Sequence, residues 1–197
     1  VPDDGYLATA KQRCEQANVL FIADEIQTGL ARTGKMLACD HENVRPDILI
    51  LGKALSGGVL PVSAVLSDDE IMMTIKPGEH GSTYGGNPLA CAVATTALQV
   101  LKDENMASHA REMGELFRNE LEKINSPFIS AVRGRGLLNA IIIKHCNPDA
   151  AWELCLALKE NGLLAKPTHG DKIRFAPPLI ITREQVTECA GIINKSI

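Results

Sequence analysis

The sequence predicts an α/β protein, with part of a mostly parallel, helix-covered sheet followed by a smaller α+β unit. Three short apolar runs without polar alternation, at residues 19–23, 47–52 and 61–66, are typical of strands buried on both faces of such a sheet. From about residue 105 the pattern changes to short strands mixed with helices. We therefore expect two domains, residues 1–105 and residues 106–197.

Helices are expected where apolar residues recur at helical spacing after a residue that can start a helix. Pro2 is expected to open the first, which would run to about Asn18, and Pro88 another that would run to about Leu101. In the second domain we expect helices at 106–125, 150–161 and 183–195, and strands at 129–133, 137–143 and 173–175.

Composition and charge exclude several classes of partner. An apolar fraction of 45% with 22% charged residues is ordinary for a globular protein. The net charge of −4, without long Lys/Arg runs, predicts neither a nucleic-acid partner nor a membrane surface. The six cysteines show no CxxC spacing and the five histidines are dispersed, so we expect reduced, mostly buried thiols and no metal site.

Asp24 directly follows the apolar run at 19–23, and Lys53 directly follows the run at 47–52. The carboxyl ends of parallel strands lie at one edge of a sheet, where ligands gather. Burial of the lysine stem would favour the neutral amine, the form that attacks an aldehyde. A fixed carboxylate would keep the ring nitrogen of pyridoxal phosphate (PLP) protonated, so the pair predicts a PLP site. Taken singly, a lysine is most often a solvated surface charge, and Asp24 is equally well explained by a helix cap or an ion pair.

Gln27 and the Gly-rich segment 80–88 extend this predicted site. Gln27 lies three residues past Asp24 and is expected to donate to the cofactor's ring oxygen, although a turn residue before a glycine is a fair alternative. Ser82 and Thr83 offer hydroxyls beside backbone N–H groups just before a helix, an arrangement that suits a phosphate.

Arg174 is a candidate for binding a substrate carboxylate. It lies between Ile173 and Phe175 and shortly before two prolines, so free solvation is not expected. Its planar guanidinium can bind a carboxylate bidentately. A structural salt bridge explains the residue equally well when it is considered alone.

Together these motifs resemble the class III PLP-dependent aminotransferases of fold type I, and within that group the ornithine aminotransferases. The segments that carry the wider resemblance are LFIADEIQTG at 20–29, GKALSGG at 52–58 and HGSTYGGNP at 80–88. The segments that carry the narrower one are 1–6, 75–80 and 166–179.

The resemblance assigns cofactor-binding roles in a PLP-binding large domain, of which residues 1–105 would be the C-terminal part. Lys53 would carry PLP as a Schiff base and serve as the catalytic residue, and Asp24 would pair with the pyridinium nitrogen. Gln27 would contact the ring oxygen. Ser82 and Thr83 would reach the phosphate of the neighbouring subunit's cofactor, which implies a homodimer. Residues 106–197 would be the small C-terminal domain.

The implied reaction transfers the δ-amino group of L-ornithine to 2-oxoglutarate, giving glutamate-5-semialdehyde and glutamate. Arg174 would bind the α-carboxylate of 2-oxoglutarate or glutamate. A glutamate of the family that masks this arginine in the ornithine half-reaction would lie outside this chain. The alternatives are another class III aminotransferase, acting on acetylornithine or 4-aminobutyrate, or a noncatalytic chain as it stands.

The chain begins at Val1 rather than at a methionine, and the resemblance covers only about the C-terminal half of a family member. The ring-stacking aromatic residue, the first phosphate loop and the ornithine contacts are therefore expected upstream. Residues 1–197 alone are expected not to turn over. If the source is eukaryotic, the resemblance to ornithine aminotransferases implies the mitochondrial matrix, with a targeting segment upstream; otherwise it implies the cytoplasm.

Overall fold

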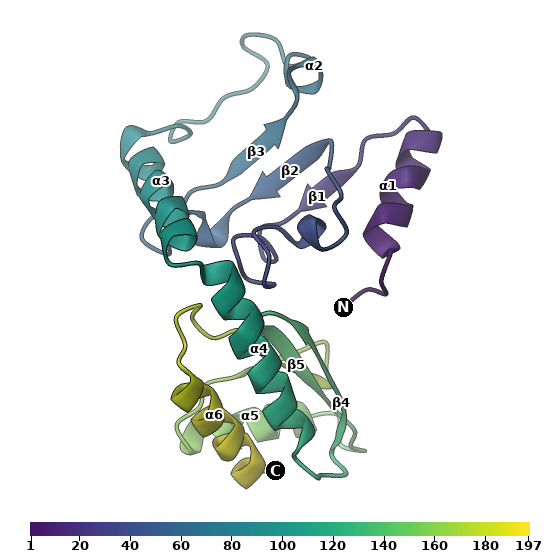
Figure 1. The fold of residues 1–197 in the computed structure, drawn as a ribbon, viewed down its shortest axis with the longest axis vertical. Helices are drawn as coiled ribbons and strands as arrows, with labels where there is room; N and C mark the ends of the chain where they lie inside the picture. The colour runs from purple at the N-terminus through teal and green to yellow at the C-terminus, as the bar shows by residue number, and fades with distance from the viewer. The chain divides into compact units, whose positions relative to one another are not determined.

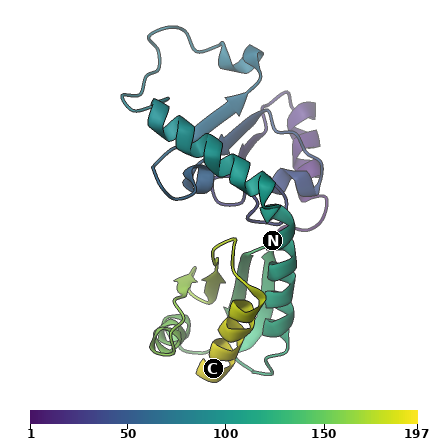
Figure 2. The same cartoon turned by 60° about the vertical axis from the view of Figure 1, so that its left-hand side comes forward.

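The computed structural model describes residues 1–197, which form two compact units (Figures 1 and 2). The first unit comprises residues 2–31 and 35–105. The second unit comprises residues 106–197 together with Val1 and the short segment 32–34. Each unit contains its own sheet and its own cluster of buried side chains. None of the helices is both long and apolar enough to cross a membrane.

The sheet of the first unit contains three strands, in the order β1 (Ile22–Asp24), β2 (Ile48–Leu51) and β3 (Ala64–Ser67). The strands β1 and β2 run parallel, but β3 runs antiparallel to β2. The expectation of a mostly parallel sheet is therefore wrong for this chain, whose sheet is mixed. The physical reason is the connection from β2 to β3, which contains only the 3-10 turn η2 (Lys53–Ser56) and no crossover helix of the kind that a parallel return needs.

The strands of this sheet are only partly buried. In β1 the side chain of Ala23 is buried, whereas that of Ile22 is 54% exposed. In β3 the side chains of Val65 and Leu66 are also exposed. Four buried side chains, from the loop after β1, from β2, from η2 and from α3, form the small core: Leu30, Leu51, Leu55 and Ala94. The expectation that all three strands are covered on both faces is therefore wrong.

Three helices complete the first unit: α1 (Tyr6–Gln16), α2 (Asp69–Met72) and α3 (Pro88–Asp103). A further 3-10 turn, η1, spans Ala38–His41. Helix α3 packs against η2, alongside the sheet (Figures 1 and 2). The expected start of α3 at Pro88 is confirmed, because the proline occupies the first helical turn and Asn87 caps the helix, its side-chain oxygen accepting a hydrogen bond from the Ala90 N–H at 2.8 Å.

The second unit has helices and strands at all the expected places. Its elements are α4 (Met106–Glu122), β4 (Ile129–Arg135), β5 (Leu138–Ile143), α5 (Ala150–Glu160), β6 (Lys166–Thr168), β7 (Lys172–Phe175) and α6 (Arg183–Ser196). The strands form an antiparallel sheet in the order β4-β5-β7-β6. The edge strand β6 is the one element that was not expected, since its Lys-Pro-Thr sequence has no apolar alternation.

Burial in the second unit follows the period of each element. Alternate residues of β5 are buried, and the apolar side chains of α4 at spacings of three and four residues are buried as well. Phe117 of α4 meets Phe175 of β7 edge to face, with ring centroids 5.6 Å apart. Each fully buried large apolar side chain, such as Leu121 or Ile141 at 0% exposure, stabilises the unit by about 1.5–3 kcal/mol.

The six cysteines are all unpaired. Cys39 and Cys155 are buried, but Cys91 and Cys146 are exposed, so the expectation of mostly buried thiols is correct only in part. No cluster of three His, Cys, Asp or Glu side chains has the geometry to hold a metal ion.

A close backbone contact in the second unit requires a glycine on α4. A Cβ atom at Gly114 would lie 1.7 Å from the carbonyl oxygen of Gly136, in the turn between β4 and β5. Since the clashing atoms belong to the backbone, they cannot rotate away.

We predict that Gly114→Ala lowers the free energy of unfolding by about 1–3 kcal/mol or more, because overpacking usually costs that much. The matched control is Gly191→Ala on α6, where a new Cβ would meet no atom within 4 Å. That substitution is expected to raise stability by up to about 1 kcal/mol, because alanine is the better helix former. Urea denaturation of both variants measures the difference. Equal stability of the two would contradict the contact.

Candidate functional site

The carboxyl ends of β1 and β2 lie at one edge of the first unit's sheet because the two strands are parallel. Asp24 ends β1 and is in register with Ile50 of β2. Lys53 follows β2 after a single intervening glycine. Nζ of Lys53 lies 3.5 Å from Oε1 of Gln27 in the loop after β1. The structure thus brings the predicted residues Asp24, Gln27 and Lys53 to the same edge.

Lys53 is exposed and has an unusual backbone conformation. The expected burial of its stem is wrong, because the chain turns outward at Gly52, directly after the buried Leu51. The φ angle of Lys53 is 46°, in the left-handed region that residues with a Cβ avoid. Such a conformation costs about 1–3 kcal/mol and is found preferentially at functional sites. Six other non-glycine residues of the chain also have a positive φ, so this conformation agrees with a functional role of Lys53 but does not by itself identify it.

Asp24 and Glu25 differ sharply in their surroundings. Asp24 is exposed, and its Oδ1 accepts a hydrogen bond from the Ile26 N–H at 3.1 Å. Glu25 is 3% exposed and accepts hydrogen bonds from the Cys39 N–H at 2.8 Å and from the Thr28 hydroxyl. Burial and, to a smaller degree, the Glu25 charge raise the pKa of the Cys39 thiol to about 12. Glu25 thus holds the loop that carries Gln27 and leaves Asp24 available to a ligand.

The Gly-rich segment borders an open pocket of about 460 Å³. Lys53 and Ser82 both line this pocket, together with the Tyr84–Asn87 turn and the first turn of α3. The Ser82 hydroxyl accepts a hydrogen bond from the Gly85 N–H at 2.9 Å, which leaves the hydroxyl proton available to donate. A Cβ at Gly85 would lie 2.9 Å from the Ser82 Cβ, so this turn needs glycine there. Thr83 is exposed on the same segment.

The start of α3 adds a feature that the sequence motifs did not assign. Asn87, which caps this helix, also donates a hydrogen bond to the Tyr84 carbonyl oxygen at 2.9 Å and so closes the loop. The free N–H groups and the dipole at a helix N-terminus favour an anion. Asparagine before proline was the signal that could have identified this cap. The pocket therefore brings together an amine, a hydroxyl and a helix N-terminus, groups that suit an aldehyde and an anion.

Arg174 belongs to the second unit. It lies in β7, in register with Ala140 of β5 on one side and Lys166 of β6 on the other. The side chain is partly buried, and its guanidinium makes neither an ion pair nor a hydrogen bond within the chain. The structural salt bridge that was the alternative explanation is therefore not formed by the residues of this chain.

Comparison with known proteins agrees with these features. The family model for class-III aminotransferases matches residues 1–197. The mitochondrial ornithine aminotransferase of Rattus norvegicus is 63% identical over 197 residues, which are 100% of this chain and 45% of the relative. The chain thus spans about half the length of the curated relatives it matches. Its assignment to the C-terminal half stays a prediction.

Solved structures give the same fold. The crystal structure of an acetylornithine aminotransferase from Elizabethkingia anophelis matches with a TM-score of 0.95 and 62% identity, over 100% of this chain and 52% of that one. An ornithine aminotransferase from Toxoplasma gondii matches with a TM-score of 0.94 and 52% identity, over 100% of this chain and 47% of that one. Because the family model matches residues 1–197 and relatives are as similar as the rat enzyme, the chain belongs to the class III aminotransferases.

Proposed function

We propose that the full-length protein is a PLP-dependent transaminase that moves the δ-amino group of L-ornithine to 2-oxoglutarate, giving glutamate-5-semialdehyde and glutamate. The observation that carries this proposal is the common edge of β1 and β2, where Asp24, Gln27 and Lys53 gather. The substrate is supported by the 63% identity to the rat ornithine aminotransferase. The cofactor is supported by a further structure of the Toxoplasma gondii enzyme, which is described as holding PLP at partial occupancy at the active site.

In this proposal each residue at the sheet edge has one task. When bound, PLP supplies an electron sink for charge at the substrate carbon. Asp24 holds the proton on the ring nitrogen, and the Gln27 amide donates to the ring oxygen. The Lys53 amine holds the cofactor covalently between turnovers. As a free amine, Nζ of Lys53 would take up and return the proton of the substrate carbon.

The remaining residues bind the charged ends of cofactor and substrate. Ser82 and Thr83 donate to the phosphate of the neighbouring subunit's cofactor in a homodimer. Arg174 binds the α-carboxylate of 2-oxoglutarate or glutamate through paired charge-assisted hydrogen bonds. Its lack of an ion pair within the chain is consistent with that role. Several eukaryotic relatives, the rat enzyme among them, are named mitochondrial, which supports a place in the mitochondrial matrix for a protein of eukaryotic source.

A second candidate is acetylornithine transamination. The observation that favours it is the acetylornithine aminotransferase structure at 62% identity. Both functions use the same residues of this chain for the cofactor. They differ only in whether the donor carries a free or an acetylated α-amino group, so the choice of donor distinguishes them.

The test of the proposed substrate is a single half-reaction of the full-length protein with each amino donor. We expect L-ornithine to convert the cofactor to its amine form at least about 10-fold faster than acetylornithine or 4-aminobutyrate. Stopped-flow absorbance measures the conversion. Faster conversion by either of the other two donors would assign the protein to that activity.

Replacement of Lys53 tests the cofactor site. Lys53→Ala is expected to remove the near-visible absorption of the lysine-linked cofactor and to lower the turnover number by about 10²–10⁴-fold, because both the covalent link and the proton carrier are lost. The exposed Lys35 of the same unit provides the control, and Lys35→Ala should change neither property. A borohydride-reducible PLP adduct at normal occupancy in Lys53→Ala would show that another lysine carries the cofactor.

Subunit mixing tests whether Ser82 and Thr83 serve the neighbouring subunit. Lys53→Ala subunits would be refolded at equal amounts with subunits that carry both Ser82→Ala and Thr83→Ala. If the loop acts across the dimer, about a quarter of wild-type activity should return, because half of the dimers are mixed and each has one intact site. If the loop acts within its own chain, as its shared pocket with Lys53 also allows, no activity returns.

A further inference from the structure

The segment that leaves β7 begins directly beyond Arg174. Phe175 ends the strand and is buried, whereas the next residue, Ala176, is exposed. Pro177 and Pro178 follow and lack the N–H groups with which a chain could bind to a neighbouring strand. The main-chain pairing that holds Arg174 therefore ends one residue after it.

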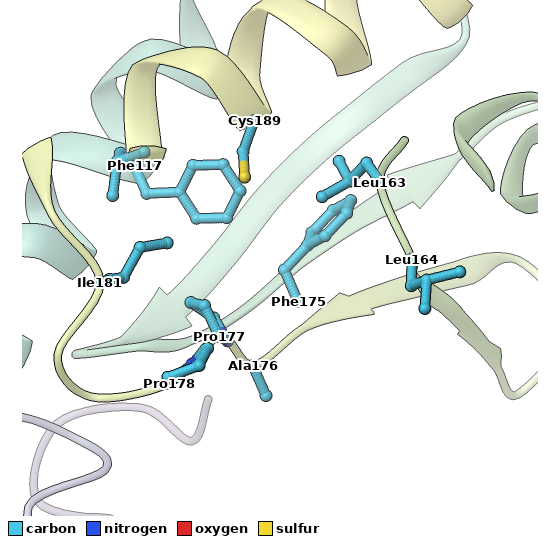
Figure 3. A pocket seen from close by; sticks show the side chains of 10 residues that line it. Phe117, Leu163, Leu164, Phe175, Ala176, Pro177, Pro178, Ile181 and Cys189 are labelled. Carbon is cyan, nitrogen blue, oxygen red and sulfur yellow. The ribbon is translucent and has the colours of Figure 1, made fainter. Parts of the chain in front are cut away.

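The packing of this segment against the core is incomplete at Ala176–Pro178. A pocket of about 240 Å³ lies between Ala176–Pro178 and the core, lined also by Phe117, Ile181 and Cys189. Figure 3 shows Phe117 and Cys189 across the pocket from Pro177 and Pro178. Atoms that face a void lack the contacts that fix their position. Leu179 and Ile181 pack against the core again further along, so the stretch that a further restraint can fix is Ala176–Pro178.

Arg32 supplies that restraint. Its Nη1 donates a hydrogen bond to the Pro177 carbonyl oxygen at 2.6 Å, and also to the Leu137 carbonyl oxygen at 3.1 Å. Leu137 is fully buried in the turn between β4 and β5, and its own N–H donates to the Arg32 carbonyl oxygen at 3.0 Å. Arg32 is therefore fixed to a rigid turn by its backbone and its side chain, and from there it reaches the segment after β7.

The bonding of Arg32 differs from that of an ordinary ion pair. Both acceptors are backbone carbonyls, and burial lowers the pKa of its guanidinium. Burial of a cation is unfavourable unless hydrogen bonds offset the lost hydration. The two bonds that do so here both fix the course of the backbone.

We propose that Arg32 is a positioning residue for substrate binding, which holds Arg174 in place for the substrate carboxylate by bracing the segment that follows it. This inference rests on the proposed function, in which Arg174 serves 2-oxoglutarate and glutamate but not the ornithine half-reaction. Loss of the brace should therefore weaken one half-reaction selectively.

The test uses Arg32→Lys in the full-length protein with its cofactor. Both bonds come from Nη1 of the rigid guanidinium, and a lysine keeps the charge but carries its ammonium, a compact and strongly hydrated group, on a flexible stem that does not hold a donor at that place. We expect the dissociation constant of glutarate, an unreactive dicarboxylate, and the KM for 2-oxoglutarate to rise about 10-fold or more, as small misplacements of binding groups do. The ornithine half-reaction should change by less than about 2-fold. Calorimetry measures the glutarate binding independently of turnover.

Arg118 provides a matched control for a purely structural role. It is also partly buried, and burial lowers the pKa of its guanidinium. Its Nη1 donates to the Gly136 carbonyl oxygen in the β4–β5 turn at 3.0 Å and to Asn139 Oδ1 in β5 at 2.8 Å. The structure gives it no bond to the segment after β7. Arg118→Lys should therefore lower the thermal stability without shifting the balance between the two half-reactions.

The outcomes separate the inference from the function on which it rests. If Arg174→Lys does not weaken the binding of glutarate while leaving the ornithine half-reaction unchanged, the role proposed for Arg174 is wrong. If Arg174→Lys has this selective effect, but Arg32→Lys changes both half-reactions equally or changes neither of them, only the positioning role of Arg32 is wrong. If Arg32→Lys does not fold, Pro177→Gly is the substitute, since it loosens the same segment and keeps the carbonyl that accepts the bond from Arg32. This variant must then weaken the binding of glutarate and leave the ornithine half-reaction unchanged.

Discussion

The parallel pairing of β1 with β2 is the constraint on which the arrangement of the candidate site depends. Because the two strands run in the same direction, the loops that follow them leave from one edge, and residues 24–27 lie beside Lys53 although 26 positions separate Gln27 from Lys53 in sequence. An antiparallel partner would have carried Lys53 to the opposite edge. The antiparallel β3 has the complementary effect, since its short connection keeps η2 and Lys53 close to the end of β2.

Adjacent residues at this edge divide structural and chemical tasks between them. Strand alternation turns Glu25 inward, where it binds the Cys39 N–H and the Thr28 hydroxyl, and turns Asp24 outward, where its one bond within the chain is to the Ile26 N–H. A buried carboxylate with satisfied hydrogen bonds makes the loop rigid. The exposed carboxylate beside it is thereby held at a defined place while it remains free to bind.

Local sequence signals accounted for most of the fold, and the errors came from non-local effects. The Asn87–Pro88 start of α3 and the apolar spacing of α4 are written in neighbouring residues, so both helices could be predicted. The direction of β3 and the exposure of Lys53 depend on how the chain turns after β2, for which apolar runs carry no signal. Arg32 could not be recognised at all, because its partners Leu137 and Pro177 lie 105 and 145 residues away in sequence.

The partly covered sheet of the first unit affects how the chain behaves in solution. Both β1 and β3 are edge strands, each bonded only to β2, and both carry exposed apolar side chains such as Ile22, Val65 and Leu66. Unpaired strand edges with apolar side chains recruit other strands. When these 197 residues are produced by themselves, self-association through the two edges will therefore compete with folding, and charged substitutions at these three side chains are the means to suppress it.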